Sequence, residues 1–413
     1  MLSHWLLYSY DALGLGHARR MTGIARAVLP SRPDLASLLV TCSPQIDALP
    51  VPQGLDYVKL PSARKISTSE YTARTMRLEP ARLRDLRATI VEQVARSFRP
   101  DFFLCDKAPC GLMGELSPTL DLLRFEMHGT RMVLGWRDIL DSPDRMAHEW
   151  RKNDILSQVE RWYDEVWVYG DPRMFDVRER YALPDSVASR IRYVGYLTPT
   201  VSPEAIREAR AHLEALAPGS PGSGPIALVT VGGGEDGEAI LARWLATAQA
   251  GLLPKDLRSV VVTGPMMPEE ARARIGASVP PSCAVTRYIG GLESHAAAAD
   301  VVVCMAGYNT SCEVLGARTP TVMIPRTSQR EEQRIRANIL AEHGLVDMVD
   351  VREASNADVA DAVRRALARG RRTDDHGLAL DGHSRVAAEV ARIVPVRTLP
   401  QSHLDVSTRK ISA

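Results

Sequence analysis

Short apolar runs recur along the whole chain, and each ends in glycine or polar residues. In the first half they occupy residues 6–9, 38–41, 102–105, 132–134, 166–169 and 191–194, and in the second half residues 226–231, 259–263, 300–304 and 321–324. Between the runs, apolar residues return at helical spacing, as in Ala18, Met21, Ile24, Ala25 and Val28. Strands that alternate with helices predict an α/β fold with parallel sheets.

A change of pattern divides the chain. Residues 195–199 end the first alternation, and a helix is predicted over residues 203–216. Residues 218–225 are too rich in proline, glycine and serine for regular structure, and the alternation then starts again. Because 413 residues exceed one ordinary core, we predict an N-terminal domain over residues 1–197, a C-terminal domain over 198–395 and a polar tail over 396–413.

Composition narrows the class of protein. Apolar residues make up 45% and charged residues 24% of the chain, which is typical of globular proteins. The net charge of +1 gives no indication of a nucleic-acid partner. The six cysteines form no CxxC pair, no apolar run is long enough to span a bilayer, and no signal peptide is recognisable. We therefore expect a cytoplasmic protein, with peripheral contact at the inner membrane surface as an alternative.

The strongest candidate site follows the run at residues 300–304. Small residues there allow a turn, and a helix is predicted to begin near Thr310. The free N–H groups and the positive end of a helix suit a diphosphate. Glu313, predicted in the first turn, could accept both hydroxyls of a ribose. Alternatively, Thr310 and Glu313 form a capping box that serves only the helix end.

Two further strand ends offer ligand-binding residues. Gly232, Gly233 and Gly234 permit close approach of the backbone to a ligand, although they also fit a plain tight turn. Glu332 and Gln333 are predicted to open a helix and to offer polar atoms to sugar hydroxyls. The alternative for this pair is a solvated, charged helix start.

The first strand-to-helix loop contains Gly14, Gly16 and His17. Its spacing is similar to GxGxxG, but Arg19 replaces the third glycine and no acidic residue follows the second strand. A nicotinamide site is therefore weakly supported. At a helix start facing the cleft, His17 could be a general base or a donor to a phosphate; the alternative is a structural, hydrogen-bonded histidine.

Carboxylates at strand ends provide other acid–base candidates. Asp11, Asp106 and Asp138 each follow an apolar run, and any one of them alone is more often structural than catalytic. Lys107 and Arg137 stand beside two of them. No cluster of residues has metal-ligand spacing, so we expect no metal and no other cofactor.

A basic stretch lies in the first half. Residues 64–99 carry nine basic and four acidic residues, in a chain whose net charge is only +1. Leu83, Leu86 and Ile90 recur at helical spacing, so part of this stretch is predicted to be a helix whose arginines project outward. The surface would attract an anionic acceptor or anionic lipid, or would simply be a solvated helix face.

Taken together, these residues resemble a known family. The run at residues 299–307, followed by Glu313, Glu332 and Gln333, resembles the C-terminal domain of the family 28, or MurG-like, glycosyltransferases, and the N-terminal loop resembles their glycine-glycine-histidine loop. The loop has Leu15 where that family has glycine, and the acceptor half matches poorly. Its Gly-Leu-Gly-His start is closer in style to other bacterial transferases, so a peptidoglycan acceptor is not implied.

The resemblance implies the GT-B fold, in which two Rossmann-like domains face each other across a cleft, and an inverting, metal-independent reaction. Donor-binding residues would be Gly232, Gly233, Gly234, Thr263, Gly264, Ile289, Ala306, Gly307, Tyr308, Asn309, Thr310, Glu313, Glu332 and Gln333. Catalytic candidates are His17 and Asp11, and acceptor-side candidates are Gly14, Gly16, Asp106, Lys107, Arg137 and Asp138.

The function predicted on this basis is transfer of a sugar from a nucleotide diphosphate, in particular UDP, to a hydroxyl or amine of an acceptor. The acceptor and the oligomeric state are left open. Two other functions remain as alternatives. One is a nucleotide-sugar 2-epimerase or hydrolase on the same fold, and the other is a non-catalytic nucleotide-sugar binding protein.

Overall fold

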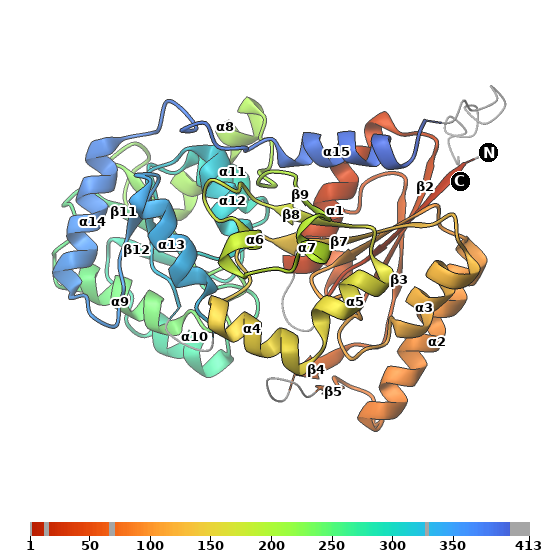
Figure 1. Ribbon diagram of the computed structural model, residues 1–413. Coiled ribbons are helices and arrows are strands. Elements are labelled where there is room, and N and C mark those ends of the chain that lie inside the picture. The colour runs from red at the N-terminus through yellow and green to blue at the C-terminus, as the bar shows by residue number, and fades with distance from the viewer. Residues whose placement is uncertain (1, 12–15, 66–70, 327–329, 397–413) are drawn as a thin grey trace, which may run out of the picture.

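The computed structural model describes residues 2–11, 16–65, 71–326 and 330–396. Figure 1 shows two α/β bodies side by side, one built from the first half of the chain and the other from the second half. Each contains a parallel sheet with helices on both faces, as the alternating pattern predicts. In the described ranges, no helix combines the length and the apolar character needed to cross a bilayer.

The N-terminal sheet has the strand order β3-β2-β1-β6-β7-β8-β9. Its strands are β1 (Ser3–Tyr8), β2 (Leu35–Thr41), β3 (Leu55–Lys59), β6 (Phe102–Asp106), β7 (Arg131–Arg137), β8 (Glu165–Tyr169) and β9 (Ile191–Tyr193). The main helices are α1 (Gly16–Val28), α2 (Pro80–Phe98), α3 (Ser117–Asp121), α4 (Pro143–Lys152), α5 (Ile155–Trp162), α6 (Val177–Arg180) and α7 (Asp185–Ala188), and a small antiparallel pair joins β4 (Ala63–Lys65) to β5 (Tyr71–Ala73). The carboxyl ends of β1, β6 and β7 therefore lie next to one another.

The C-terminal sheet has the order β12-β11-β10-β13-β14-β15. Its strands are β10 (Ile226–Thr230), β11 (Arg258–Val262), β12 (Cys283–Thr286), β13 (Val301–Cys304), β14 (Thr321–Met323) and β15 (Asp347–Met348). Its helices are α8 (Pro203–Leu216), α9 (Glu238–Gln249), α10 (Glu269–Gly276), α11 (Leu292–Ala298), α12 (Tyr308–Ala317), α13 (Glu332–Glu342) and α14 (Asn356–Arg369). The order reverses between β10 and β13, which is where ligands bind in open parallel sheets.

The last helix, α15 (Gly382–Ile393), returns to the N-terminal domain. It lies along α1 in all three ribbon views, and Val386 and Val390 share one apolar core with α1. The two chain crossings between the domains are hydrogen-bonded to each other: Tyr196 N donates to Ala379 O at 2.7 Å and Gly382 N donates to Tyr196 O at 3.0 Å. The range 198–395 predicted for the C-terminal domain thus includes a helix that packs on the other sheet.

The basic stretch forms α2 for much of its length, as predicted, but not all its arginines project outward. Arg87 is fully buried and its guanidinium is paired with the buried carboxylate of Glu115. The buried positions of α2 are Leu83, Arg87, Val91 and Ala95, four residues apart, which places Leu86 on the outer face at 38% exposure. Of the apolar residues whose spacing predicts this helix, Leu83 is buried, whereas Leu86 is not.

Candidate active site

A cleft of about 400 Å³ lies between the two domains. From the N-terminal domain it is lined by the start of α1 and by Arg137 at the end of β7. From the C-terminal domain it is lined by the loops that follow β10, β11 and β12 and by the start of α12. The strand ends on which the sequence placed its candidate residues therefore meet at one place.

Most of the predicted donor residues line this cleft. They are Gly232, Gly233, Gly234, Gly264, Ile289, Gly307, Tyr308, Asn309, Thr310 and Gln333, and from the acceptor side Gly16, His17 and Arg137 join them. Thr263, Ala306 and Glu332 do not line it but are each the chain neighbour of a lining residue. Glu313 does not line it either, and its chain neighbours do not. Gly14 lies outside the described residues.

Helix α12 begins at Tyr308, two residues before the predicted start. Gly307 is its N-cap residue, and no side chain caps the helix. The capping box of Thr310 and Glu313 therefore does not form, and Glu313 lies in the second turn rather than in the first. The first N–H groups of the helix, which have no partner within it, remain available to a ligand in the cleft.

Glu313 is a buried carboxylate that reaches across the domain boundary. Its Oε1 accepts an ion-pair contact from Arg19 Nη2 of α1 at 2.7 Å, and the same nitrogen contacts Glu293 Oε2 at 2.8 Å. Its Oε2 is shielded and has no hydrogen-bond partner among the residues that the structure describes. Burial raises the pKa of Glu313 to about 7; Arg19 opposes this shift and Glu293 adds to it. An acceptor atom without a donor is what a ribose hydroxyl would satisfy.

Two glycine loops of the C-terminal domain meet backbone to backbone beside α12. Gly234 has φ +97° and Gly264 has φ +86°. A Cβ at Gly234 would lie 2.2 Å from Thr263 O, and one at Gly264 would lie 2.5 Å from Gly233 O. Side chains are excluded at both positions, so the loops leave their backbones open to the cleft.

The start of α13 carries the last two predicted donor residues, Glu332 and Gln333. Glu332 opens this helix, as predicted, and accepts a contact from the Arg326 guanidinium, while Gln333 Oε1 accepts from Arg326 N at 3.2 Å. Arg326 also contacts Asp236 Oδ2 at 3.1 Å. Burial opposes ionisation of Glu332, but Arg137 and Arg326 hold its pKa below the usual value. Glu332 is buried, which rules out the alternative of a solvated helix start.

His17 and Asp106 form a pair on the N-terminal side. His17 Nδ1 is hydrogen-bonded to Asp106 Oδ2, and Asp106 is buried at the end of β6. Burial lowers the pKa of His17 to about 3, against the opposing influence of Asp106, so the ring is neutral near pH 7. With the Nδ1 proton held by Asp106, Nε2 is the nitrogen that can accept a proton.

A family model described as the glycosyltransferase family 28 C-terminal domain matches residues 228–387. The C-terminal domain belongs to glycosyltransferase family 28. This match covers β10 to α15 and so contains the glycine loops, α12 and α13. The resemblance found in the sequence is thereby confirmed.

Curated proteins are also similar to about half of this chain. A UDP-N-acetylglucosamine–N-acetylmuramyl-(pentapeptide) pyrophosphoryl-undecaprenol N-acetylglucosamine transferase of Rhodococcus opacus is 32% identical over 189 residues, which are 45% of this chain and 47% of that protein. The transferase of the same name from Frankia casuarinae is 28% identical over 200 residues, 48% of this chain and 51% of the relative. The chain thus spans about half the length of these relatives.

Solved structures extend the likeness to both domains. MurG of Acinetobacter baumannii matches with a TM-score of 0.59 at 13% identity, covering 94% of this chain and 99% of that one. The glycosyltransferase of kitacinnamycin matches with a TM-score of 0.61 at 14% identity, covering 96% of this chain and all of the other, 100%. At such identities the likeness concerns the fold alone, and it confirms the predicted GT-B architecture.

Three of the candidate residues in the N-terminal domain make contacts within the protein: the carboxylates Asp11 and Asp138, and Lys107 from the acceptor-side set. Asp11 is buried outside the lining, where its carboxylate accepts from Ser9, from Thr41 Oγ1 at 2.8 Å and from Ala18 N at 3.0 Å. These contacts join Asp11 to the end of β2 and to the start of α1, which argues against the proposed role as a base. Asp138 pairs with Arg336, and Lys107 Nζ lies 4.3 Å above the ring of Tyr10.

Sequence reasoning missed the residues that join the family 28 domain to the N-terminal one. Arg19 was noted only because it breaks the glycine pattern, and Arg336 stood in a run of charged residues without a distinguishing mark. Arg336 is fully buried and donates to Asp138 Oδ1 at 2.6 Å and to Ala306 O at 2.8 Å. Its position four residues after Glu332, on the same helical face, was the available signal.

Among the residues that the structure describes, no three His, Cys, Asp or Glu side chains are placed to hold a metal ion.

Proposed function

We propose that this protein is an inverting glycosyltransferase that moves a sugar from a nucleotide diphosphate to a hydroxyl or amine of an acceptor, without a metal ion. The observation that carries the proposal is that a base and a helix start suited to an anion lie on opposite sides of one cleft. The neutral base His17, held by Asp106, lies on one side, and the open start of α12 lies on the other. The family of the C-terminal domain and the fold of the whole chain support it.

The geometry assigns a part to each side. His17 Nε2 would take the proton of the acceptor hydroxyl as its oxygen bonds to the anomeric carbon. On the opposite face of that carbon, the bond to the phosphate oxygen breaks and its electron pair leaves with the nucleotide diphosphate. The N–H groups and the positive end of α12 would stabilise this leaving group. Attack and departure on opposite faces invert the anomeric configuration.

UDP is the nucleotide that we propose for the donor. The names of the relatives include a UDP-linked sugar, and their similarity covers 45% and 48% of this chain. Glu313 supports a ribonucleotide, because its shielded Oε2 lacks a donor that a ribose hydroxyl would supply. The sugar and the acceptor are not specified by these contacts.

The proposal is tested with the purified protein and a set of nucleotide diphosphates. We expect UDP to raise the melting temperature more than ADP, GDP or dTDP do, because ligands that bind only the folded state stabilise it. Turnover of UDP-sugars with an acceptor is expected to survive EDTA. Loss of turnover in EDTA that magnesium or manganese restores would refute metal independence. Conversion of the donor alone, without an acceptor, would instead indicate the epimerase or hydrolase.

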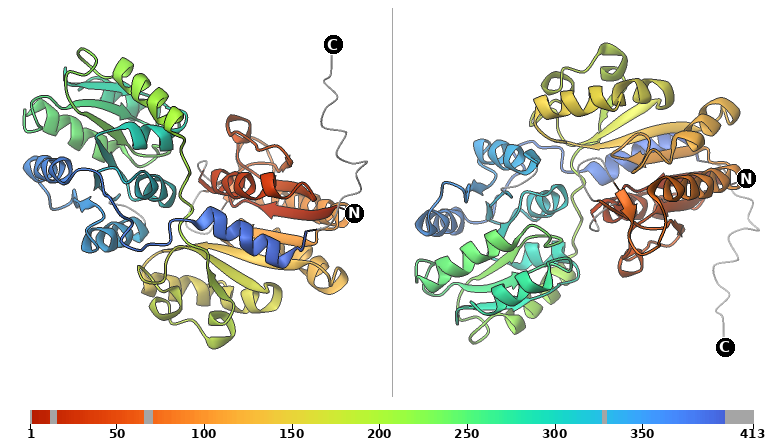
Figure 2. Two further views of the ribbon diagram at one scale, coloured as in Figure 1. Left: turned by 90° about the horizontal axis from the view of Figure 1, so that it is seen from above. Right: turned by 90° about the horizontal axis from the view of Figure 1, so that it is seen from below.

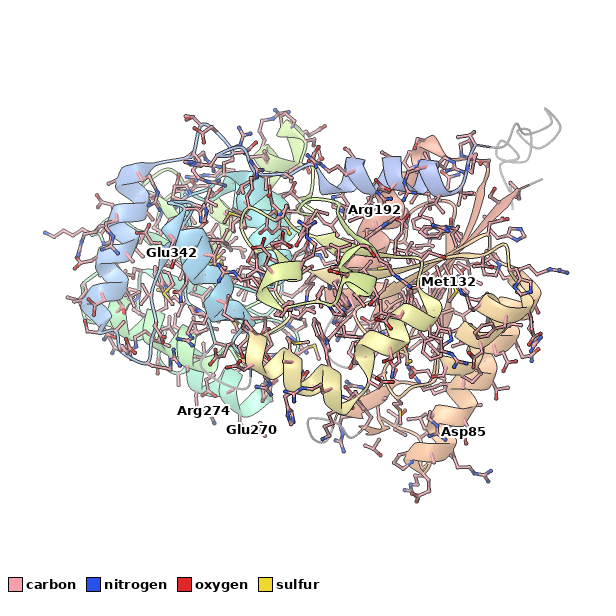
Figure 3. All side chains as sticks on the ribbon, in the orientation of Figure 1. Asp85, Met132, Arg192, Glu270, Arg274 and Glu342 are labelled. Carbon is pink, nitrogen blue, oxygen red and sulfur yellow. The ribbon has the colours of Figure 1, made fainter. Side chains whose placement is uncertain are left out.

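Replacing Glu313 by glutamine is expected to weaken UDP binding by about 10- to 100-fold, the usual value of hydrogen bonds to a charged group. Because Glu313 has a pKa of about 7 in the free protein, UDP affinity of the wild type should rise with pH through this value, whereas the variant should lose that dependence. Isothermal titration calorimetry between pH 6 and pH 8.5 measures both. Glu342→Gln, on the outer part of α13 and labelled in Figure 3, is the matched control.

The raised pKa of Glu313 also predicts a change in stability. Its carboxyl stabilises the folded protein fully below its unfolded pKa, and that contribution is lost as pH rises through about 7. Glu313→Gln should therefore gain stability relative to the wild type between pH 5 and pH 8. A variant that melts at a lower temperature at every pH and binds UDP normally would show that Glu313 is only structural.

Peripheral contact with an anionic membrane is a further part of the proposal. Around the start of α2, Met76 and Leu86 are 47% and 38% exposed, next to Arg77, Arg82 and Arg84. Apolar side chains among basic ones favour a lipid surface, at roughly 1 kcal/mol for each basic residue near it. Asp85, labelled in Figure 3, lies on this part of α2, at the periphery of the molecule.

Reversing Arg77 and Arg84 to glutamate should reduce binding to vesicles that contain anionic phosphatidylserine, and raising the salt concentration should reduce wild-type binding in the same way. Co-sedimentation with neutral phosphatidylcholine vesicles is the control. Unchanged binding of the double variant to anionic vesicles would leave α2 as a solvated helix face.

A further inference from the structure

Arg137 is a cation in the cleft with no hydrogen-bond or ion-pair partner among the described residues. It ends β7, lines the cleft and is mostly buried, and its Nε is shielded from solvent without a hydrogen bond. Within the described part of the chain, the structure contains no hydrogen bond or ion pair of its guanidinium. Its neighbours differ: Arg336 pairs with Asp138, and Arg20 lies 3.6 Å from Asp106.

The charges around Arg137 leave a local excess of positive charge. Glu332 and Asp138 attract it, but Glu332 is in contact with Arg326 and Asp138 with Arg336. Arg20 and Arg336 repel it. Burial lowers the pKa of Arg137 to about 10, which still leaves the guanidinium charged near pH 7. A half-buried guanidinium whose shielded Nε has no partner is costly, so this position suits an anion from outside the chain.

The cleft indicates where that anion lies. Arg137 from the N-terminal domain and the start of α12 from the C-terminal domain, at Gly307 to Thr310, line the same space, together with Gln333. A diphosphate held at the helix start would therefore have α12 on one side and Arg137 on the other. The guanidinium can donate two parallel hydrogen bonds to phosphate oxygens.

We propose that Arg137 binds the diphosphate of the donor and stabilises it as it leaves. This inference rests on the proposed function and adds a catalytic residue from the opposite domain. When the bond between the anomeric carbon and the phosphate oxygen breaks, the electron pair stays on that oxygen. Negative charge then increases where the Arg137 N–H groups donate, so their contribution is larger in the transition state than in the bound donor.

A phosphate or carboxylate on the acceptor is the other possible source of the anion that Arg137 binds. The two sources differ in which ligand loses affinity when Arg137 is replaced. A set of uridine, UDP and inorganic pyrophosphate separates them, because uridine lacks the anion and pyrophosphate lacks the nucleoside.

The experiment compares the wild type with Arg137→Met and Arg137→Lys. For Arg137→Met we expect UDP affinity, measured by calorimetry, to fall about 10- to 100-fold, while uridine affinity changes less than about twofold. Inorganic pyrophosphate should raise the melting temperature of the wild type but not of this variant. With saturating donor, kcat should fall further than UDP affinity, and Arg137→Lys should recover part of both. Arg192→Met, on β9 and labelled in Figure 3, controls for loss of an arginine.

Three results would overturn the inference. Equal losses for uridine and UDP would show that Arg137 only shapes the cleft. Unchanged UDP affinity with a raised KM for an anionic acceptor would assign the anion to the acceptor. Unchanged binding of every probe would show that Arg137 meets no anion. If the wild type binds pyrophosphate through Arg137 but no nucleotide, the anion site stands and the proposed transferase function fails, so the two failures are distinguishable.

Discussion

Replacing His17 by alanine is expected to lower kcat by roughly 10²- to 10⁴-fold, the usual contribution of a general base. UDP affinity should change little, because His17 belongs to the N-terminal domain and is proposed to act on the acceptor. Asp106→Asn should also lower kcat, because an amide can donate to Nδ1 and so favour the tautomer in which Nε2 carries the proton. Steady-state kinetics at saturating UDP-sugar measures both variants.

The pH profile provides an independent check on this role. With a pKa of about 3, His17 stays unprotonated as pH falls from 8 to 5, so kcat at saturating donor should show no acid limb near pH 6.5 from this group. Thr22→Ser, which lines the same cleft on α1, is a control for a small change near His17. A kcat within about threefold of the wild type in His17→Ala would exclude His17 as the base.

Replacing Arg336 by methionine is expected to reduce the free energy of unfolding by about 3–5 kcal/mol, the cost of leaving a buried charge without its partner. Arg336 and Asp138 are 2% and 1% exposed, and they join α13 to the end of β7. The change would also remove the donor to Ala306 O. Urea unfolding followed by tryptophan fluorescence measures the loss, with thermal unfolding to show whether the domains still melt together.

Two controls define the interpretation of Arg336→Met. Arg274→Met breaks the exposed contact with Glu238 and should cost no more than about 1 kcal/mol, as is usual for surface pairs. Arg274 lies on α10 at the outer surface, where Figure 3 labels it. Adding Asp138→Asn to Arg336→Met should restore part of the stability, because the unpaired charge is then removed. A loss below about 1 kcal/mol for Arg336→Met alone would contradict a buried, closed pair.

Strands that are buried on both faces could be predicted from sequence, whereas edge strands were predicted less consistently: the half-exposed β9 was found and others were not. β6, β8, β10 and β11 are buried at every position, and each contains three or four consecutive apolar residues. β3 and β12 at the sheet edges were missed, because only their first residues are buried. The return of α15 to α1 was missed for a different reason. An amphipathic helix shows that it has an apolar face, but not which domain covers that face.

The same division applies to the candidate site. Residues that act through backbone geometry, such as Gly234 and Gly307, follow from the strand-to-turn pattern. Arg19 and Arg336 could not be assigned, because their carboxylate partners Glu313 and Asp138 lie in the opposite domain, 294 and 198 positions away. Apart from the spacing of Arg336 from Glu332, nothing local distinguishes these buried arginines from solvated ones. Their roles depend on how the two sheets face each other.

The hydrogen-bonded crossings at Tyr196 and Gly382 determine how the two domains can move. A GT-B protein with one linker could open, twist and slide, since a single covalent connection restrains only one point. Here two connections lie side by side, with Tyr196 bonded to both Ala379 and Gly382, so they form a short common axis. Motion that keeps these bonds is rotation about that axis. Opening would then separate Arg19 from Glu313 and Arg137 from α12 in a single movement, and a fragment ending at residue 197 would expose the apolar side of α1 that α15 covers.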